Sequence, residues 1–507
     1  MSFAKVHSAQ INLLKPYIVD VEVDISKGLH SFTIVGLPDK GVEEARDRVA
    51  SAIKNSGFKS PKAKNQKVVV SLAPADIKKE GPHFDVPIAL SYLLSSEDIK
   101  FNPAKKLFVG ELSLDGGVRR VSGVLPLVQE AARLGFEEAY VPKDNAEEAA
   151  LIKGISIFGV SMLKELIDHL EGSENKIQKT EETRVTSFSS DPLYDFSDVR
   201  GQETAKRGLE IAASGGHNIA LLGPAGTGKT MLARAFTGIL PQLSYEEILE
   251  VTSIHSIAGL LRNQYVTDPP FRSPHHTSSY VSLVGGGAFP KPGEVTLSHR
   301  GVLFLDEFPE FERRVIDALR EPLEERVVSI SRSKGTGRFP ASFILVAAMN
   351  PCPCGNFGTE KECRCSALDL LRYKKKISGP IVDRIDMWIE VPLITHNKLS
   401  SRNEGVEKSR AIRERVQKTR AIQENRFKEK TTVHLNSQMG PKEIDQFVEL
   451  DEDIKELLNT AAEKMKLSPR AYHKVIKLAC TIADLGGSEK VEAPHILEAL
   501  QYRPKDN

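Results

Sequence analysis

Residues 223–230 read Gly-Pro-Ala-Gly-Thr-Gly-Lys-Thr, and they lie between an apolar run at 218–222 and a helical pattern at 231–240. The spacing G-x-x-x-x-G-K-T, in the order strand, loop and helix, is typical of a loop whose backbone N–H groups surround phosphates. The N-terminus of the following helix adds a dipole that favours anions. This part of the chain is therefore predicted to be an α/β fold with a nucleotide site rather than an ordinary glycine-rich turn.

The predicted cofactor-binding segment is the whole loop, Gly223, Pro224, Ala225, Gly226, Thr227, Gly228, Lys229 and Thr230. We expect Lys229 to reach the β- and γ-phosphates of ATP, and the hydroxyl of Thr230 to ligate Mg²⁺. A second apolar strand at 302–305 ends in Asp306 and Glu307. Asp306 can hold Mg²⁺ through water there, and Glu307 can polarise the attacking water. Many buried strands end in an acid, so this interpretation depends on the phosphate loop.

A third predicted strand, at 343–349, ends at Asn350, directly before Pro351. An amide at a strand end near the γ-phosphate can orient the attacking water. Asn is also a common turn former. The local sequence leaves both interpretations open.

Four of the five cysteines form two C-x-C pairs, Cys352 with Cys354 and Cys363 with Cys365. Four thiolates can bind one tetrahedral Zn²⁺, and because all positions are then filled by protein the role would be structural. The alternative is a set of reduced thiols or a redox-sensitive loop. Cys480 lies in an apolar helical stretch and is expected in the core.

The length of 507 residues suggests about three domains. Strand-like and helical patterns alternate over residues 1–170, and a polar linker follows at 171–192. Residues 193–394 are the predicted ATPase core, and residues 395–507 are helical throughout. The predicted class is α/β with an all-helical C-terminal domain.

The chain has 69 basic and 68 acidic side chains, a formal charge of +1, but its basic residues cluster locally. Basic stretches occur at 54–67, 372–376 and 401–430, and they suit a sequence-independent contact with a phosphate backbone. For the first stretch a solvated loop is an equally good interpretation. No membrane span or signal peptide is apparent, and the odd cysteine count points to a reducing compartment, so a cytoplasmic location is expected.

Several motifs occur in an order that resembles an AAA+ ATPase of the magnesium-chelatase-like branch: the phosphate loop, LFLDE, Asn350, SGPIVDRIDMWIEV and SPRAYHKVIKLACTIADL. The segments FRSPHHTSSYVSLVGGGAFPKPGEVTLSHRGVLFLDEFPEF and MNPCPCG resemble the bacterial ComM (YifB) family more closely. The resemblance covers nearly the whole chain. It implies a central AAA+ domain with a C-terminal helical lid, assembled as a homohexameric ring.

The same resemblance implies roles for two arginines. Arg384, in GPIVDRIDM, would be the arginine finger that reaches the γ-phosphate bound by the neighbouring subunit; the alternative is an ion pair with Asp383 or Asp386. Arg470, after Ser468 and Pro469 at a predicted helix start, would be the lid arginine that senses the γ-phosphate; the alternative is a surface arginine.

The N-terminal domain resembles the Lon-protease-like (S5-type) α/β fold through KEGPHFD and VGELSLDGGV. His83 occupies the place of the serine nucleophile of such proteases, and the partner lysine would fall near Leu125. A Ser–Lys dyad cannot form, so we expect a non-proteolytic scaffold. His275 and His276 are interpreted as a hydrogen-bonding loop rather than a metal site; by resemblance, they and Arg272 lie in a pore insertion that could meet nucleic acid.

The expected function is an ATP-dependent hexameric DNA motor, by resemblance a helicase that promotes branch migration when incoming DNA is recombined during natural transformation. Its expected partners are further copies of itself, single-stranded and branched DNA, and recombination proteins, with no membrane. The alternative is a chelatase-like or protein-remodelling AAA+ ATPase that does not translocate DNA. ATP, Mg²⁺ and Zn²⁺ are the expected cofactors.

Overall fold

The computed structural model describes residues 3–174, 176–185, 194–261, 263–287, 291–332, 335–357, 359–394, 407–430 and 433–504. Parts of the predicted linker (175 and 186–192), of the predicted lid (395–406) and of the third basic stretch (401–406) lie outside these residues. The chain divides into two compact units. Unit 1 is Met1–Thr186 with Ser244–Val266, and unit 2 is Ser187–Leu243 with Thr267–Asn507. Over the described ranges, no helix combines the length and apolar character that a membrane span requires.

Unit 1 is built on a seven-stranded sheet in the order β3-β4-β2-β1-β5-β8-β9. Its strands are β1 (Phe3–Asn12), β2 (Lys15–Lys27), β3 (Ser31–Val35), β4 (Gln66–Ala73), β5 (Lys106–Phe108), β8 (Glu138–Pro142) and β9 (Ser156–Val160). The pairs β1–β2 and β2–β4 are antiparallel, and the other neighbours are parallel. Alternate residues of β2 and β4 are fully buried, as their alternating sequence predicts: Val19, Val21, Val23, Val68, Val70 and Leu72. A short hairpin pairs β6 (Glu111–Leu112) with β7 (Val118–Arg119).

The helices of unit 1 are α1 (Lys40–Asn55), α2 (Asp85–Ser95), α3 (Val124–Arg133), α4 (Ala146–Ala149), α5 (Leu163–Leu170) and α8 (Tyr245–Ile257). Helix α8 comes from the sequence region predicted as ATPase core, yet it packs against α3. The buried carboxylate of Glu148 explains this packing, because it accepts hydrogen bonds from Ser256 Oγ, Leu125 N and Asn145 Nδ2. Ser256 Oγ in turn accepts a 3.0 Å bond from Gly123 N. These satisfied polar groups fix one face of α8 against α3 in unit 1.

Unit 2 contains a parallel five-stranded sheet in the order β11-β14-β17-β10-β18. The strands are β10 (Ile219–Leu222), β11 (Phe271–Arg272), β14 (Val302–Leu305), β17 (Ile344–Met349) and β18 (Met387–Glu390). Strands β14 and β17 are buried along their whole length, which is why they read as continuous apolar runs. Since all five strands run the same way, the segments that follow them meet at one edge of the sheet.

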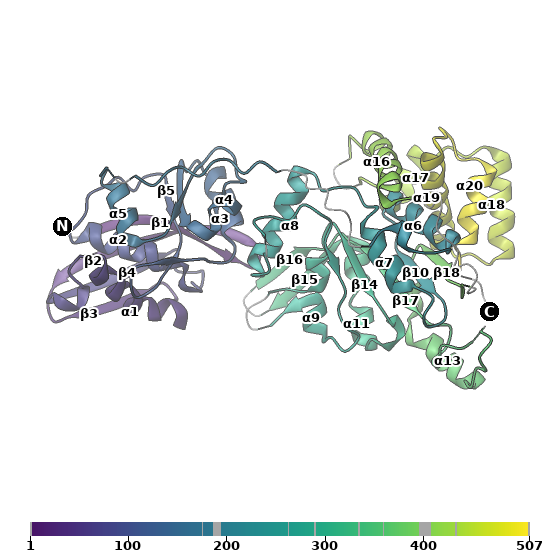
Figure 1. Ribbon diagram of the computed structural model, residues 1–507, viewed down its shortest axis with the longest axis horizontal. Coiled ribbons are helices and arrows are strands. Elements are labelled where there is room, and N and C mark those ends of the chain that lie inside the picture. The colour runs from purple at the N-terminus through teal and green to yellow at the C-terminus, as the bar shows by residue number, and fades with distance from the viewer. Residues whose placement is uncertain are drawn as a thin grey trace. The chain divides into compact units, whose positions relative to one another are not determined.

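Helices surround this sheet, and Figure 1 shows α16–α20 grouped together in green and yellow. The helices nearest the sheet in sequence are α6 (Glu203–Gly215), α7 (Lys229–Thr237), α9 (Tyr280–Val284), α10 (Glu294–Leu297), α11 (Arg313–Asp317), α12 (Arg320–Glu325), α13 (Ala367–Lys376) and α14 (Gly379–Val382). The C-terminal ones are α16 (Ser409–Arg426), α17 (Pro441–Phe447), α18 (Glu452–Lys464), α19 (Pro469–Gly486) and α20 (Ala493–Gln501). Unit 2 also contains two antiparallel pairs of strands, β12 (Gly285–Gly286) with β13 (Lys291–Pro292), and β15 (Val327–Arg332) with β16 (Gly335–Pro340).

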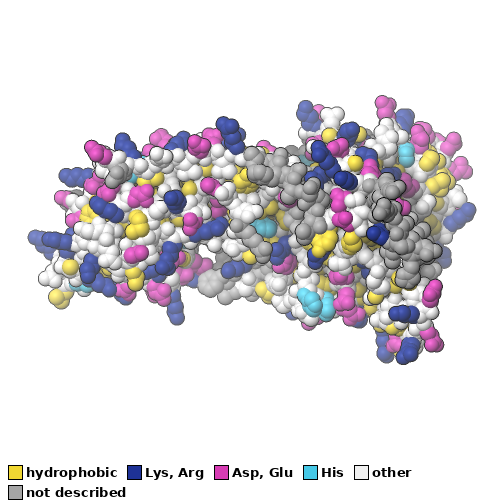
Figure 2. Space-filling view, viewed as in Figure 1, with side chains coloured by type: hydrophobic (Ala, Val, Ile, Leu, Met, Phe, Trp, Pro, Cys, Tyr) yellow, Lys and Arg dark blue, Asp and Glu magenta, His cyan; other side chains and the backbone are white. Residues whose placement is uncertain are grey.

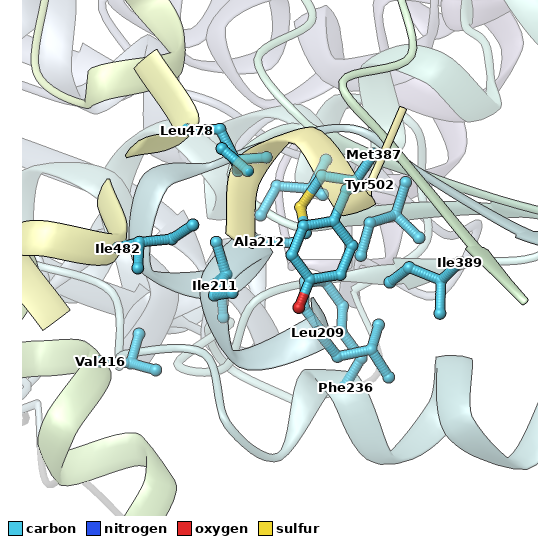
Figure 3. Packing of buried hydrophobic residues seen from close by; sticks show 14 of the residues in the cluster. Leu209, Ile211, Ala212, Phe236, Met387, Ile389, Val416, Leu478, Ile482 and Tyr502 are labelled. Carbon is cyan, nitrogen blue, oxygen red and sulfur yellow. The ribbon is translucent and has the colours of Figure 1, made fainter. Parts of the chain in front are cut away.

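A single apolar cluster joins the sheet to the C-terminal helices. Figure 3 shows Leu209 and Ile211 of α6 among Val416 of α16, Leu478 and Ile482 of α19, and the strand residues Met387 and Ile389. All of these side chains are buried. The mixed α/β class and the helical C-terminal region are therefore confirmed.

Candidate functional site

The phosphate loop leaves β10 at Leu222 and enters α7 at Lys229. Gly226 and Gly228 have φ of +79° and +88°, in the left-handed region that favours glycine. A Cβ at Gly223 would lie 2.2 Å from the backbone oxygen of Val391, so a larger residue would displace the neighbouring strand end. The loop conformation thus requires glycine at each of these positions.

The ammonium group of Lys229 lies inside this loop. Its Nζ donates hydrogen bonds to the carbonyl oxygens of Gly223 (2.6 Å) and Pro224 (2.7 Å), and to Oδ1 of Asn350 (3.1 Å). Burial lowers the pKa of Lys229, and the nearby charge of Asp306 opposes that shift. Three acceptors satisfy the three donors of the ammonium, so the cation is held where a phosphate would meet it.

The hydroxyl of Thr230 donates a 2.9 Å hydrogen bond to Oδ2 of Asp306. Parallel pairing places β17 between β10 and β14, so the phosphate loop, Asp306 and Asn350 all follow neighbouring strands. Hydroxyl and carboxylate oxygens are the ligands that Mg²⁺ prefers. The donor set therefore fits Mg²⁺, and the glycine-lined loop fits the phosphates of a nucleotide.

Glu307 adopts a left-handed backbone conformation with φ of +49°, directly after Asp306. Its Oε2 lies 3.2 Å from Nδ1 of His276. His275 lies 2.8 Å from the hydroxyl of Thr277, as expected of a hydrogen-bonding loop. The contact of His276 with Glu307 was missed by the sequence reasoning, because only the pairing of β11 with β14 reveals that the two segments are neighbours. Arg272, at the end of β11, pairs with both carboxylate oxygens of Glu294.

Arg384 and Arg470 share one carboxylate. Arg384 Nη2 contacts Oε2 of Glu324 in α12, and Arg470 Nη2 lies 3.2 Å from Oε1 of the same residue. The Arg384 side chain is 15% exposed and also donates to the carbonyl oxygens of Pro380 (2.7 Å) and Arg320 (3.2 Å), whereas the Arg470 side chain is 60% exposed. The structure thus brings these two arginines together and pairs Arg384 with Glu324 rather than with Asp383 or Asp386.

Asp386 instead joins the strand β18 region to α19. Its Oδ1 lies 3.1 Å from Nζ of Lys474, which also donates to the carbonyl oxygen of Ile385. Burial raises the pKa of Asp386, but the positive charges of Lys474 and neighbouring groups outweigh burial and hold the pKa below its ordinary value. This ion pair fixes the segments that carry Arg384 and Arg470 relative to each other.

The four clustered cysteines have their Sγ atoms within 4.8 Å of one another. Cys352 is buried, Cys354 is exposed, and all five cysteines of the chain are free thiols. The nearby backbone N–H of Asn356 and the neighbouring sulfur of Cys352 lower the pKa of the Cys354 thiol to about 6. Cys480 is buried in the core, as expected.

In unit 1, burial lowers the pKa of His83 to about 4. Lys79 is also buried, and its Nζ donates to the carbonyl oxygens of Pro74 and Ile77. Leu125 lies in the apolar core on α3. The two positions at which a Ser–Lys dyad was sought therefore hold a buried histidine and a buried leucine.

The basic stretches differ in how much of their charge faces solvent. Lys62 and Lys64 pair with Asp47 (2.7 Å) and Asp98 (2.9 Å). On α16, four arginines bind groups of unit 2, so this helix anchors the C-terminal region; they are Arg413, Arg415, Arg420 and Arg426. Arg372 and Lys375 of α13 are exposed, and Figure 2 shows Lys and Arg side chains at the lower right, where Figure 1 places α13.

Comparison with known proteins places this geometry in a family. Residues 21–145 match the family model "Subunit ChlI of Mg-chelatase", residues 195–399 match "Magnesium chelatase, subunit ChlI", and residues 406–503 match its C-terminal model. Competence protein ComM of Haemophilus influenzae is 43% identical over 507 residues, which cover 99% of this chain and 98% of that protein. YifB of Escherichia coli is also 43% identical, over 510 residues that cover 100% of this chain and 98% of that protein.

A shorter similarity links the chain to DNA repair protein RadA of Streptococcus pneumoniae, 37% identical over 91 residues, 18% of this chain and 21% of that protein. This similarity agrees with a Lon-like fold for the N-terminal domain, beside an AAA+ domain and a helical C-terminal domain. The similarity to ComM and YifB extends over the full length of the chain. The chain therefore belongs to the ComM/YifB family of magnesium-chelatase-like AAA+ proteins.

Proposed function

We propose that this protein is an ATP-driven DNA motor that works as a homohexameric ring. In this proposal it is a cytoplasmic helicase that promotes branch migration, with recombination proteins as partners, when incoming DNA is recombined during natural transformation. The observation that carries the ATPase part is the meeting of Lys229, Thr230, Asp306 and Asn350 at one sheet edge. The full-length similarity to a competence protein supports the biological context.

Each residue at this edge has a task in ATP hydrolysis. Lys229 exchanges its carbonyl acceptors for the β- and γ-phosphate oxygens, and Asn350, already within hydrogen-bond distance of Lys229, orients the attacking water. Glu307 polarises that water. Mg²⁺ held by Thr230 and Asp306 would neutralise phosphate charge. Glu307 contacts His276, so we infer that it must turn away from His276 to act.

The arginines support a site shared between subunits. Because Arg384 and Arg470 converge on Glu324, both guanidiniums can be presented together to one anion. In a ring that anion would be the γ-phosphate bound by the neighbouring copy, with Glu324 displaced. A guanidinium supplied in trans speeds hydrolysis by about 10³–10⁵-fold in other nucleotide hydrolases.

DNA contact is assigned to exposed basic residues. Arg372 and Lys375 of α13 face solvent, as do Lys54, Lys59 and Lys67 of unit 1. A ring repeats each patch, so a chain of near-zero net charge can still form a positive channel. The pore insertion, whose residues 288–290 lie outside the described chain, would add His275.

The test is the ATPase rate of the full chain with single-stranded, forked and four-way-junction DNA at two salt concentrations. We expect stimulation that weakens at the higher salt concentration, because phosphate contacts release counterions. Lys229→Ala should abolish turnover, and Glu307→Gln should keep nucleotide binding while blocking hydrolysis. If no DNA binds or stimulates turnover, the DNA-motor proposal is wrong even when the ATPase is active.

The second candidate is a chelatase-like or protein-remodelling ATPase. It is favoured by the three magnesium chelatase family models, which together match most of the chain. This candidate shares the ATPase machinery, so K229A and E307Q do not separate the two. DNA-independent turnover that a protein substrate stimulates would favour this alternative.

A further inference from the structure

The cysteine cluster beside β17 has the dimensions of a zinc site. The Sγ–Sγ distances are 3.3 Å between Cys352 and Cys354, 3.6 Å between Cys354 and Cys363, and 3.8 Å between Cys363 and Cys352. Zinc–sulfur bonds of about 2.3 Å in a tetrahedron place sulfur atoms about 3.8 Å apart. Cys365 completes the set of four.

We propose that these four cysteines bind one Zn²⁺, and that this zinc loop, residues 352–357 and 359–365, holds Asn350 and the phosphate loop in their working positions. The proposal that zinc binds is argued from the cysteine cluster itself. The proposal that zinc positions Asn350 and the phosphate loop rests on the proposed nucleotide site.

Zinc explains the cluster better than a disulfide does. A disulfide needs sulfur atoms about 2.05 Å apart, whereas the sulfur atoms of Cys352, Cys354 and Cys363 are all more than 3 Å from one another. A backbone N–H, that of Phe357, points at Cys352 Sγ over 3.3 Å, as expected where a protein stabilises a metal-bound thiolate. Four thiolates fill a tetrahedral zinc, so the ion has no open position for catalysis and its role is structural.

The zinc loop begins two residues after Asn350, the residue that accepts the hydrogen bond of Lys229. Gly355, with φ of +77°, faces the phosphate loop. A Cβ built on it would lie 3.8 Å from Cβ of Ala225 and 3.9 Å from Nδ2 of Asn350. The loop backbone therefore packs on both parts of the nucleotide site.

The other end of the zinc loop also returns to Asn350. It leads into α13, whose Tyr373 is buried; burial raises the pKa of the Tyr373 hydroxyl to about 12, and the nearby backbone N–H of Asn350 opposes that shift. The chain thus leaves Asn350, passes through the cysteine cluster, and comes back to it. A metal that ties the four sulfur atoms together restricts this closed segment, and with it the position of the Asn350 amide.

The first experiment measures zinc in the full chain purified without chelator, by elemental analysis. We expect about one zinc per chain, and less than about 0.2 would overturn the proposal. Cys363→Ser with Cys365→Ser should lose the metal. Cys480→Ala is the matched control, because it removes a cysteine outside the cluster and should keep the metal.

Serine variants could fail to fold, so wild-type protein is also titrated with a mercurial thiol reagent while a zinc indicator follows release. Release of one zinc with the modification of about four thiols supports the cluster. Zinc that stays bound after those thiols react would mean that the metal lies elsewhere, and the proposal would be wrong.

The second experiment tests the coupling to nucleotide. Zinc is stripped from the reduced full chain with a chelator, the chelator is removed, Mg²⁺ is restored, and binding of a fluorescent ADP analogue is measured. We expect affinity to fall about tenfold or more and to recover with added Zn²⁺ but not with additional Mg²⁺. Unchanged affinity in zinc-free protein would overturn the coupling. Zinc-loaded protein that binds no nucleotide would instead refute the proposed ATPase.

Discussion

Lys229 donates a 3.1 Å hydrogen bond from Nζ to Oδ1 of Asn350, although 121 residues separate them in sequence. The bond crosses from the start of α7 to the end of β17, which pairs with β10 in the parallel sheet. It joins the cation of the phosphate loop to the amide whose role the local sequence left open.

Asn350→Ala should slow hydrolysis more than it weakens binding. The amide orients water in the transition state, whereas Lys229 also donates to the carbonyl oxygens of Gly223 and Pro224 and keeps these two bonds without Asn350. We expect kcat to fall about 10–100-fold with a change of less than about threefold in nucleotide affinity. Single-turnover hydrolysis and ADP-analogue binding would measure the two effects. Equal losses in both would assign Asn350 to binding alone.

His276→Ala should raise the basal ATPase rate. Nδ1 of His276 lies 3.2 Å from Oε2 of Glu307, and when that nitrogen carries a proton its hydrogen bond makes the carboxylate a weaker acceptor for the proton of the attacking water. We expect kcat to rise about threefold with unchanged nucleotide affinity. His275→Ala is the matched control, because His275 lies against Thr277 instead. A lower rate for His276→Ala would mean that the histidine positions Glu307 for catalysis.

Mixing two inactive variants should restore activity if the arginines act across a subunit boundary. Lys229→Ala lacks a working phosphate loop, and Arg384→Ala lacks the guanidinium. In rings of both, a site with its loop from one variant and its arginine from the other is complete, so about one quarter of the sites should turn over. Since Arg470 shares Glu324 with Arg384, Arg470→Ala should behave in the same way. No recovery in either mixture would place the arginines at their own subunit's nucleotide.

Arg372→Ala with Lys375→Ala should weaken DNA binding without changing the DNA-free ATPase rate. Both residues are exposed on α13. Loss of two phosphate contacts should reduce the slope of log affinity against log salt concentration by about two. Lys455→Ala, an exposed lysine paired with Glu452 on α18, is the control and should leave the slope unchanged. Full DNA affinity in the double variant would remove α13 from the proposed interface.

Unit 2 should lose stability between pH 6.5 and about 4. Burial lowers the pKa of His217 to about 4, although the charge of Asp386 opposes the shift and Lys474 and Lys477 reinforce it. Between these pH values His217 is therefore protonated in the unfolded chain but not in the folded chain, and the free energy of unfolding falls as pH falls. His217→Gln, whose amide can still bond Thr481, should flatten this dependence in urea unfolding at pH 7 and pH 5. An equally steep dependence in His217→Gln would assign the acid sensitivity to other groups.

The local sequence was sufficient to predict those features of the structure that depend on backbone angles, hydrophobic patterns and helix caps. The glycines of the phosphate loop indicate positions with left-handed backbone angles. The continuous apolar runs of β14 and β17 predict strands that are buried on both sides. Ser468 followed by Pro469 predicts the start of α19. The sequence also placed Asp306 and Asn350 directly after strands, as the structure shows, and their roles remain predictions. The domain boundaries and the roles of the arginines remain predictions.

Other features depend on pairings between distant segments. The helix α8 packs in unit 1 because Ser256 donates a hydrogen bond to the buried Glu148. The hydrophobic periodicity of residues 244–266 does not predict this contact. The basic pattern of α16 predicts a surface for DNA; Arg415 and Arg426 are paired with Glu210 and Asp484, whereas Arg410 is exposed. Charge counted along a chain does not show which charges a fold pairs.

By itself, the sequence determined the chemistry of this protein: a phosphate loop, two acids after a strand, an amide after another, two arginines and four thiols. The tertiary structure decided which of these groups meet. The order of the strands brings Asn350 into contact with Lys229 and His276 into contact with Glu307. Helix packing brings Arg384 and Arg470 to the carboxylate of Glu324. The reason is physical: residue type and local spacing set what a side chain can donate or accept, whereas its partner is set by sheet pairing and core burial, which are properties of the whole chain.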